Sequence, residues 1–314
     1  MKPLPRRQRG VALLIALLAV ALAAVLIAGL LDRGELTLAR TRNALRGEQA
    51  EAYAQALESY AVEVLSKDAP EEDSHADAWA NPLPPQPVPG GILIGSLSDL
   101  NGCFNLNNLA GPDSGAWVPV FQRLLTNLGA DPAIANEAKN WISTAENVDG
   151  FYLAQPVPYR SAQRAFAHVS ELRLVKGVTS DVYARVAPYV CALPAGTMLN
   201  VNTASVPVLM ALGPSITKAQ AERVWQDGHA QLGNQFMDNW GLVVDDALKT
   251  TRCCLGVTSS YFLARGDVRL DDVPFTFFSV IDRAGGYRVI ARSRGSDDAL
   301  VAPALPDQGA DPAH

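Results

Sequence analysis

The sequence predicts an α+β protein in which a long amino-terminal helix packs on an antiparallel sheet that carries a large all-helical insertion. Three observations predict this class. An uncharged apolar run covers residues 10–31, strand-like segments lie at 92–110 and 251–295, and a block with helical periodicity separates them at 111–250. With 314 residues, 48% of them hydrophobic, the chain can bury the core of one or two domains.

The charge of the chain is unevenly spread. Residues 1–9 contain four basic residues and no acidic one, which leaves 22 basic against 32 acidic residues in the remainder. An acidic body repels polyphosphate, so nucleic acid is not expected as a partner. The overall composition also excludes a collagen, a coiled-coil rod and a wholly disordered chain.

The apolar run at residues 10–31 is long enough to cross a membrane. A helix rises about 1.5 Å per residue, so this run spans the roughly 30 Å hydrocarbon core of a bilayer. Because the basic cluster precedes it, the positive-inside rule keeps residues 1–9 in the cytoplasm and places the chain after Asp32 across the membrane. An ordinary signal peptide is the alternative, but its apolar region is shorter and ends in a small-x-small cleavage site.

An amphipathic pattern follows the apolar run without a break. Tyr53, Leu57, Tyr60 and Val64 recur at three- and four-residue spacing and mark one apolar face. We therefore expect one helix over residues 11–67. Residues 11–31 form its transmembrane half, and the other half packs on a soluble domain.

The next two segments are predicted to be a linker and a first pair of strands. Residues 68–91 are rich in proline, alanine and acidic residues and show no apolar periodicity, which indicates a linker or loop. Residues 92–110 show alternation around the dipeptide Asn101-Gly102, which is typical of a hairpin turn. Two short strands are expected there.

The block at residues 111–250 carries helical signals and a local repeat. Amphipathic helices are expected at 117–128 and 131–143. The segments 178–186 (VTSDVYARV) and 216–224 (ITKAQAERV) align, and in each the threonine can cap the helix that follows. The repeat resembles a pair of helix-hairpin-helix modules.

Strand-like character returns at residues 251–295. We expect strands at 259–268, 274–281 and 287–293, with a tight turn at 283–286 (RAGG) between the last two. The tail at 296–314 is expected to be disordered.

The start of the chain resembles a type IV pilin-like prepilin, since Arg9-Gly10 precedes the apolar segment Val11–Ile15. In that family a prepilin peptidase cuts after the glycine and the new amino terminus is methylated. The resemblance therefore implies a leader at 1–10 and a cut between Gly10 and Val11. Family members carry glutamate at the fifth mature position, where this chain has Ile15.

The substituted residue Ile15 has a physical consequence within that resemblance. A glutamate in lipid is costly unless it is paired, and in pilin filaments it meets the ammonium group of a neighbouring subunit. A subunit without this glutamate cannot offer the pair to a neighbour above it, so it could cap a filament. Chance loss in a degenerate homologue is the alternative.

Further segments resemble the minor pseudopilin K family of type II secretion systems. The matching segments are 99–109 (DLNGCFNLNNL), 169–178 with 188–190, 200–204 (NVNTA) and the carboxy-terminal strands. The resemblance implies a pilin-like fold and a subunit that joins the minor pseudopilins I and J at the tip of the periplasmic pseudopilus. There it would promote assembly for protein export and contact the exported protein. It also implies a single-pass protein of the bacterial inner membrane with a periplasmic globular domain.

The same resemblance suggests calcium in the helical insertion, in a loop after Trp141-Ile142. Asn140, Glu146 and Asp149 are the candidate ligands. Calcium takes six to eight oxygens and usually several carboxylates, so a site with two acids would be weak or lost. An ordinary polar loop is the alternative. No other cofactor is expected.

The four cysteines allow three pairings, and an oxidising periplasm permits disulfides. Cys253 and Cys254 are adjacent, and a bridge between neighbours is strained. We expect one long-range bridge from Cys191 to Cys253 or Cys254. Cys103 is then a buried thiol.

No catalytic site is expected. The four histidines stand apart from one another, and the sequence contains neither a Gly-x-Ser-x-Gly elbow nor a phosphate-binding loop of the Gly-x-x-x-x-Gly-Lys type. The alternative function is that of a membrane-anchored periplasmic binding module, which uses the helix-hairpin-helix-like repeats on DNA or a cell-wall ligand. The hairpins at 176–178 and 213–216 carry little basic support for it.

Overall fold

The computed structural model describes residues 6–69, 71–111, 113–144, 148–227, 242–250 and 254–295. The chain divides into two units, residues 1–53 and residues 54–314. The predicted tail at 296–314 lies outside the described residues.

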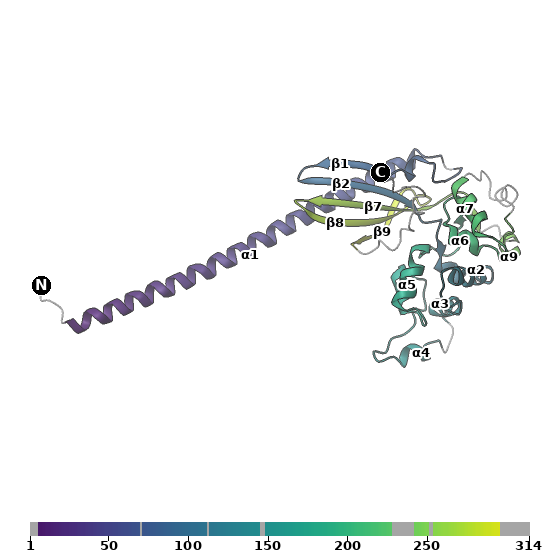
Figure 1. The fold of residues 1–314 in the computed structure, drawn as a ribbon. Coiled ribbons are helices and arrows are strands. Elements are labelled where there is room, and N and C mark those ends of the chain that lie inside the picture. The colour runs from purple at the N-terminus through teal and green to yellow at the C-terminus, as the bar shows by residue number, and fades with distance from the viewer. Residues whose placement is uncertain are drawn as a thin grey trace, which may run out of the picture. The chain divides into compact units, whose positions relative to one another are not determined.

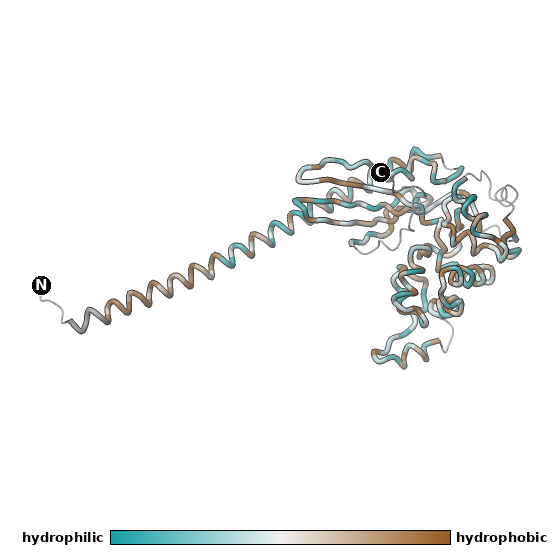
Figure 2. Tube along the Cα trace, in the orientation of Figure 1, coloured by the Kyte–Doolittle hydropathy of each residue, from teal (hydrophilic) through white to brown (hydrophobic). Residues whose placement is uncertain are grey.

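One continuous helix, α1, runs from Arg6 to Ser66 and makes up the described part of the first unit (Figure 1). It corresponds to the helix expected at 11–67 and begins earlier. Figure 2 shows that hydrophobic residues dominate its amino-terminal stretch and that polar residues become frequent further along. Gly29, Gly34 and Gly47 do not interrupt it, although each weakens a helix by about 1 kcal/mol relative to alanine.

The second unit contains a five-stranded sheet in the order β1-β2-β7-β8-β9, in which every neighbouring pair is antiparallel. Its strands are β1 (Leu83–Val88), β2 (Gly91–Asp99), β7 (Tyr261–Leu270), β8 (Val273–Asp282) and β9 (Arg288–Arg294). Strands β2 and β7 are neighbours, and the helical insertion lies between them in the sequence. The predicted α+β class with a helical insertion is confirmed.

The structure corrects the linker expected at residues 68–91. A 3-10 turn, η1 (Ala78–Ala80), buries Trp79, and residues 83–88 form strand β1. The three prolines of β1 hid this strand from the sequence pattern, because proline cannot donate to a ladder and is confined to edges. Among the described residues, strand β1 is an edge strand that pairs with β2 alone.

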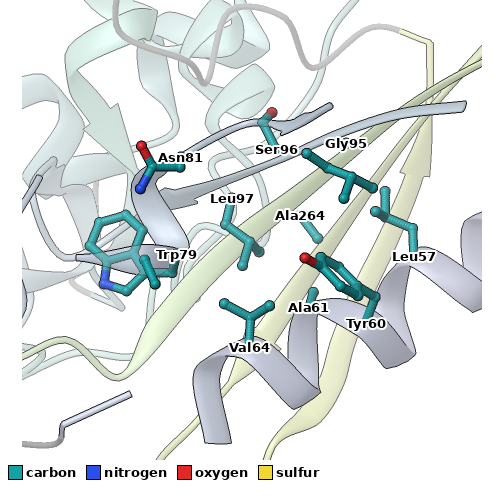
Figure 3. Close-up of a pocket in the computed structure, with 12 residues that line it drawn as sticks. Leu57, Tyr60, Ala61, Val64, Trp79, Asn81, Gly95, Ser96, Leu97 and Ala264 are labelled. Carbon is teal, nitrogen blue, oxygen red and sulfur yellow. The ribbon is translucent and has the colours of Figure 1, made fainter. Parts of the chain in front are cut away.

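The last turns of α1 pack against the sheet. Ala61 and Leu65 share a core cluster with Trp79, Phe262 and Ile281. Figure 3 shows Leu57, Ala61 and Val64 of α1 facing Leu97 and Ala264 around a small pocket of about 40 Å³.

Two cross-strand glycines let the helix approach the sheet. Gly95 of β2 pairs with Gly266 of β7, and both lie under Leu57. A Cβ atom on Gly95 would lie 2.4 Å from Leu57 Cδ1, and one on Gly266 would lie 2.7 Å from Leu57 Cδ2. Larger residues at these two positions would push the helix away from the sheet.

Glu58 is a charged residue on the buried face of α1. Its carboxylate accepts hydrogen bonds from Ser279 Oγ at 2.6 Å and from Arg292 Nε and Nη2 at 2.7 and 2.8 Å. Burial disfavours the charged form, but the hydrogen bonds from Arg292 and Ser279 outweigh it and lower the pKa of Glu58. This contact fixes the helix to β8 and β9.

The described part of the insertion contains short helices and two pairs of very short parallel strands. Its helices are η2 (Leu106–Leu109), α2 (Ser114–Asn127), α3 (Ile134–Ile142), α4 (Gly150–Leu153), η3 (Val169–Leu174), α5 (Ser180–Val186), η4 (Ala187–Tyr189), α6 (Val206–Ala211), α7 (Lys218–Asp227) and α9 (Asp246–Thr250). Strand β3 (Phe104–Asn105) pairs with β4 (Val190–Cys191), and β5 (Leu199–Asn200) pairs with β6 (Leu255–Gly256).

The core of the insertion forms around α2. Trp117, Phe121 and Leu124 of this helix are buried, and the ring of Phe121 stacks on Phe104 with 4.7 Å between the centroids. The two helices expected at 117–128 and 131–143 correspond to α2 and α3. In the repeat, Thr179 and Thr217 cap the following helices through their hydroxyls, as predicted.

The prediction of a hairpin at Asn101-Gly102 is wrong. Strand β2 ends at Asp99, and the next strand, β3, pairs in parallel with β4 rather than folding back on β2. Asn101 is buried, and its side chain bonds to distant backbone groups instead of forming a surface turn. Gly102 is required for close approach, since a Cβ atom there would lie 2.6 Å from the carbonyl oxygen of Thr203.

The expected disulfide pairing is also corrected. Cys191 is bonded to Cys103, with 5.8 Å between their Cα atoms. The parallel pairing of β3 with β4 places these cysteines together, and local sequence does not reveal such a long-range pairing. Cys254 is a buried thiol outside this bridge, and Cys253 lies outside the described residues.

We predict that Glu58→Gln lowers the free energy of unfolding by about 1–2 kcal/mol at neutral pH, because one oxygen of the bidentate acceptor becomes a donor facing Arg292. Since the pKa of Glu58 is lowered in the fold, its contribution is present above the ordinary carboxyl range and disappears as the pH falls through it. Chemical denaturation of the full chain in detergent, followed by circular dichroism, measures this difference. Glu63→Gln on the exposed face of α1 is the control and should change stability by less than about 0.5 kcal/mol. An equal loss for Glu58→Gln at pH 3 and pH 7 would contradict the ion-pair explanation.

We also predict that peptide mapping of the alkylated, unreduced chain recovers Cys103 and Cys191 in one linked species. Reduction should lower the free energy of unfolding by about 2–4 kcal/mol, because the bridge closes a long loop in the unfolded chain. A linked peptide that joins Cys191 to Cys253 or Cys254 would refute this pairing.

Candidate functional site

The amino-terminal part of α1 is the first candidate site. Among the described residues, one helix is long and apolar enough to cross a membrane, and it is this one. No ionisable residue occurs from Val11 to Leu31, and the side chain of Ile15 is 62% exposed. Gly10 and Val11 lie in the helix, and Val11 and Ile15 share one helical face because they are four residues apart. A glutamate at position 15 would therefore lie on the same face as residue 11.

The predicted calcium ligands are not assembled into a site by the described contacts. Asn140 is exposed in the last turn of α3, and Glu146 lies outside the described residues. The carboxylate of Asp149 accepts hydrogen bonds from Ser161 Oγ at 2.7 Å and Ser161 N at 2.9 Å, and it pairs with Arg160 at 3.2 Å. These bonds, led by the Ser161 hydroxyl, lower the pKa of Asp149. Calcium in this loop stays a prediction.

The second candidate site is a buried cluster of polar side chains, which we call the polar junction: Asp99, Asn101, Asn200, Thr203 and Ser259. Asp99 Oδ2 accepts hydrogen bonds from Ser259 Oγ at 2.6 Å, from Asn200 Nδ2 at 3.2 Å and from Thr203 Oγ1. Its other oxygen accepts from Asn101 N at 2.7 Å. Burial raises the pKa of Asp99 to about 6, against the effect of these hydrogen bonds.

The polar junction joins the end of β2, the insertion and the start of β7. Asn101 Oδ1 accepts from Ser260 N at 3.1 Å and Tyr261 N at 3.0 Å, while Asn101 Nδ2 donates to Met198 O at 3.0 Å. Asn200 Nδ2 also donates to Asp73 O at 3.1 Å and Ser259 Oγ at 2.8 Å. The side-chain amides of Asn101 and Asn200 thus form hydrogen bonds with backbone groups of segments that are distant in the sequence.

Three further asparagines continue this pattern inside the insertion. Asn107 donates to the carbonyls of Phe166 and Leu193, and its Oδ1 accepts from Phe166 N at 2.7 Å. Asn105 bonds to Pro194 O at 2.9 Å and Leu193 N at 3.0 Å, and Asn108 bonds to Gly196 N and Thr197 O. Apolar periodicity in the sequence does not reveal these roles. The signal was present in 99–109, where asparagines alternate with apolar residues that become buried.

A cavity of about 220 Å³ lies beside the polar junction and the disulfide. It is lined by residues of η1, the end of β2, η4 and the loop before α6, among them His75, Trp79, Asp99, Cys103, Tyr189 and Ser205. Asp99 is the acid in this lining, and it already accepts four hydrogen bonds. His75 packs against the ring of Trp225 with 5.3 Å between the centroids. The arrangement supports a structural junction rather than a reaction.

Each hairpin of the helix-hairpin-helix-like repeat touches another part of the insertion. A Cβ atom on Gly177 would lie 3.2 Å from Ile134 Cγ1, and one on Gly213 would lie 2.1 Å from Val243 O. Lys176, the basic residue of the first hairpin, is exposed and pairs with Glu137 at 2.9 Å. Buried residues of the repeat, among them Val186 and Val224, belong to the core of the insertion.

Comparisons with known proteins agree with this architecture. Two family models described as "Type II secretion system (T2SS), protein K" match residues 102–195 and 199–227, which include Asn200 of the polar junction and the buried Asn105, Asn107 and Asn108. The chain is 34% identical to the type II secretion system protein K of Pectobacterium carotovorum, over 92% of this chain and 97% of that protein. It is 36% identical to the protein K of Pseudomonas aeruginosa, over 92% and 94%.

A solved structure shares the fold. A chain of "The Crystal Structure of the GspK-GspI-GspJ complex from enterotoxigenic Escherichia coli Type 2 Secretion System" superposes with a TM-score of 0.73 at 28% identity, and the match covers 82% of this chain and 99% of that chain. Sequence and structure thus point to the same relatives across the sheet and the insertion. This chain belongs to the type II secretion system protein K family.

Proposed function

We propose that this chain forms the tip of the periplasmic pseudopilus of a type II secretion system together with the minor pseudopilins I and J, and that it promotes assembly of the pseudopilus for protein export. As a member of the protein K family it is a minor pseudopilin, a structural component of the secretion system. The observation that carries the proposal is the fold match, over 82% of this chain, to a chain of the solved GspK-GspI-GspJ complex.

The membrane helix sets the orientation in this proposal. Residues 11–31 anchor the chain in the inner membrane, the basic leader stays in the cytoplasm, and the sheet and insertion lie in the periplasm, where they contact the exported protein. A disulfide between Cys103 and Cys191 suits that oxidising compartment.

Ile15 supports a position at the end of the filament. In the proposed assembly, prepilin peptidase cuts between Gly10 and Val11, and the new ammonium group of residue 11 lies on the helical face that residue 15 shares. An isoleucine there offers no carboxylate to the ammonium group of an overlying subunit. The subunit can therefore pack on partners below it but gives no matching site above it.

The alternative, a binding module for DNA or a cell-wall ligand, is not favoured. It requires hairpins with basic support, whereas Lys176 of the first hairpin is paired with Glu137 and the second hairpin, 213–216, contains no basic residue. An enzymatic role lacks support in the described residues as well, because His75 packs on Trp225 and His168 caps η3 through Nδ1.

We predict that mass spectrometry of the mature chain finds a methylated Val11 as the amino terminus. Gly10→Ala should reduce this processing at least tenfold, because the peptidase recognises the glycine before the cut. Ile15→Glu is the matched control in the same helix and should be processed almost as well as the parent. An intact Met1 in the parent, or equal processing of Gly10→Ala and the parent, would refute the assignment.

We also predict that the full chain co-purifies with two smaller pilin-like proteins, the minor pseudopilins I and J, after mild detergent extraction. Retention on a DNA column serves as the comparison for the alternative function and should be at background. If cross-linking finds one copy of this chain flanked by other copies on both sides along a fibre, the tip position is contradicted.

A further inference from the structure

Three carboxylates converge just beyond the end of α1. Asp68, Asp73 and Asp77 each bring one carboxylate oxygen to within 4.8 Å of the others. Asp73 is completely buried, and Asp68 and Asp77 are partly buried. They belong to the segment between α1 and β1, far in the sequence from the loop at 140–149.

One carboxylate oxygen of this cluster accepts no hydrogen bond from an amide, a hydroxyl or a guanidinium group of the described residues. Burial and the charges of Asp77 and Asp73 raise the pKa of the neighbouring Asp68 to about 6, so all three carboxyls are ionised only above that pH. Asp73 Oδ2 accepts hydrogen bonds from Ser259 N at 2.6 Å and from Arg283 Nη2. Asp73 Oδ1 is buried and has no hydrogen-bond partner within the part of the chain that the structure describes. A buried carboxylate oxygen without a partner costs free energy of folding, so a hydrogen-bond donor or a cation is expected beside it.

The neighbouring cation cannot fill this role. Arg283 uses Nη1 on Asp68 Oδ2 at 3.2 Å, and it uses Nη2 on Asp73 Oδ2 and on the carbonyl of Ser259. Three carboxylates and one guanidinium leave a net charge of −2 in a largely buried place. A divalent cation beside Asp73 would balance that charge.

The donor set selects the kind of cation. All three side chains offer oxygen, which suits Ca²⁺ or Mg²⁺ and not the nitrogen and sulfur ligands that zinc prefers. Calcium–oxygen bonds are about 2.3–2.6 Å long, so two ligands on opposite sides of Ca²⁺ lie up to about 5 Å apart, which accommodates the observed limit of 4.8 Å. Magnesium needs shorter bonds in a stricter octahedron.

We propose that Asp68, Asp73 and Asp77 bind one Ca²⁺, at a site separate from Asn140, Glu146 and Asp149. The remaining ligands are water and backbone carbonyls, as in other calcium sites with few carboxylates. The ion would fix the segment after α1 to the sheet, because Asp73 also bonds to Ser259 before β7 and to Arg283 after β8. This inference does not depend on the tip position in the pseudopilus.

The test is equilibrium dialysis of the full chain in detergent against ⁴⁵Ca²⁺, after removal of metal with a chelator. All variants are made in a protein that already carries Asp149→Asn, because this substitution removes the carboxylate expected to serve a site in the insertion. We expect this variant to bind one Ca²⁺, and we expect addition of Asp77→Asn to weaken that binding at least tenfold. Asparagine keeps an oxygen that can accept from Ser74 N, so the local turn is retained.

Two further measurements guard against unfolding as the cause. Asp68→Asn in the same background should weaken binding by a similar factor, and far-ultraviolet circular dichroism should show the same helix content for all variants. The midpoint temperature of thermal unfolding should rise when Ca²⁺ is added to the Asp149→Asn protein. It should stay unchanged in the Asp77→Asn/Asp149→Asn protein. Absence of bound Ca²⁺ in Asp149→Asn, or equal binding with and without Asp77→Asn, would overturn the proposal and assign a shared proton to the cluster instead.

Discussion

The architecture depends on holding together two neighbouring strands that the sequence separates by the whole insertion. Strand β2 leaves the sheet after Asp99, and β7 enters it at Tyr261. Asn101 binds the amides of Ser260 and Tyr261, and Leu100 N donates to Tyr261 O at 2.9 Å. Asp99 adds a hydrogen bond from Ser259 Oγ. The polar junction thus closes the insertion at its base, and the sheet can form as if the strands were consecutive.

Buried polar groups are costly, so such a junction is stable only when its members are satisfied. Asparagine suits this task because one amide both donates and accepts. Asn101, Asn105, Asn107 and Asn200 each connect backbone segments far apart in the sequence. The same environment raises the pKa of Asp99, because burial disfavours its charged form.

Sequence periodicity predicted the elements whose pattern is local. The long helix, α2, α3 and the three carboxy-terminal strands follow from apolar spacing, and Thr179 and Thr217 cap helices as their positions indicated. Two of the errors share one cause, which is a dependence on distant partners. Asn101 is buried because Ser260 and Tyr261 meet it, and Cys103 joins Cys191 because β3 pairs with β4. No local window contains those partners. The strand at 83–88 was missed for another reason: its partner β2 follows after two residues, but the prolines of β1 break the strand pattern.

The two borders of the sheet limit how the molecule can join others. Three of the six residues of β1 are prolines, which have no amide donor for an incoming strand. The opposite border, β9, carries Arg288, Arg292 and Arg294, and charged side chains on an edge strand disfavour pairing with another strand, even though Arg292 is paired with Glu58. Lateral growth by strand addition is therefore disfavoured at both borders.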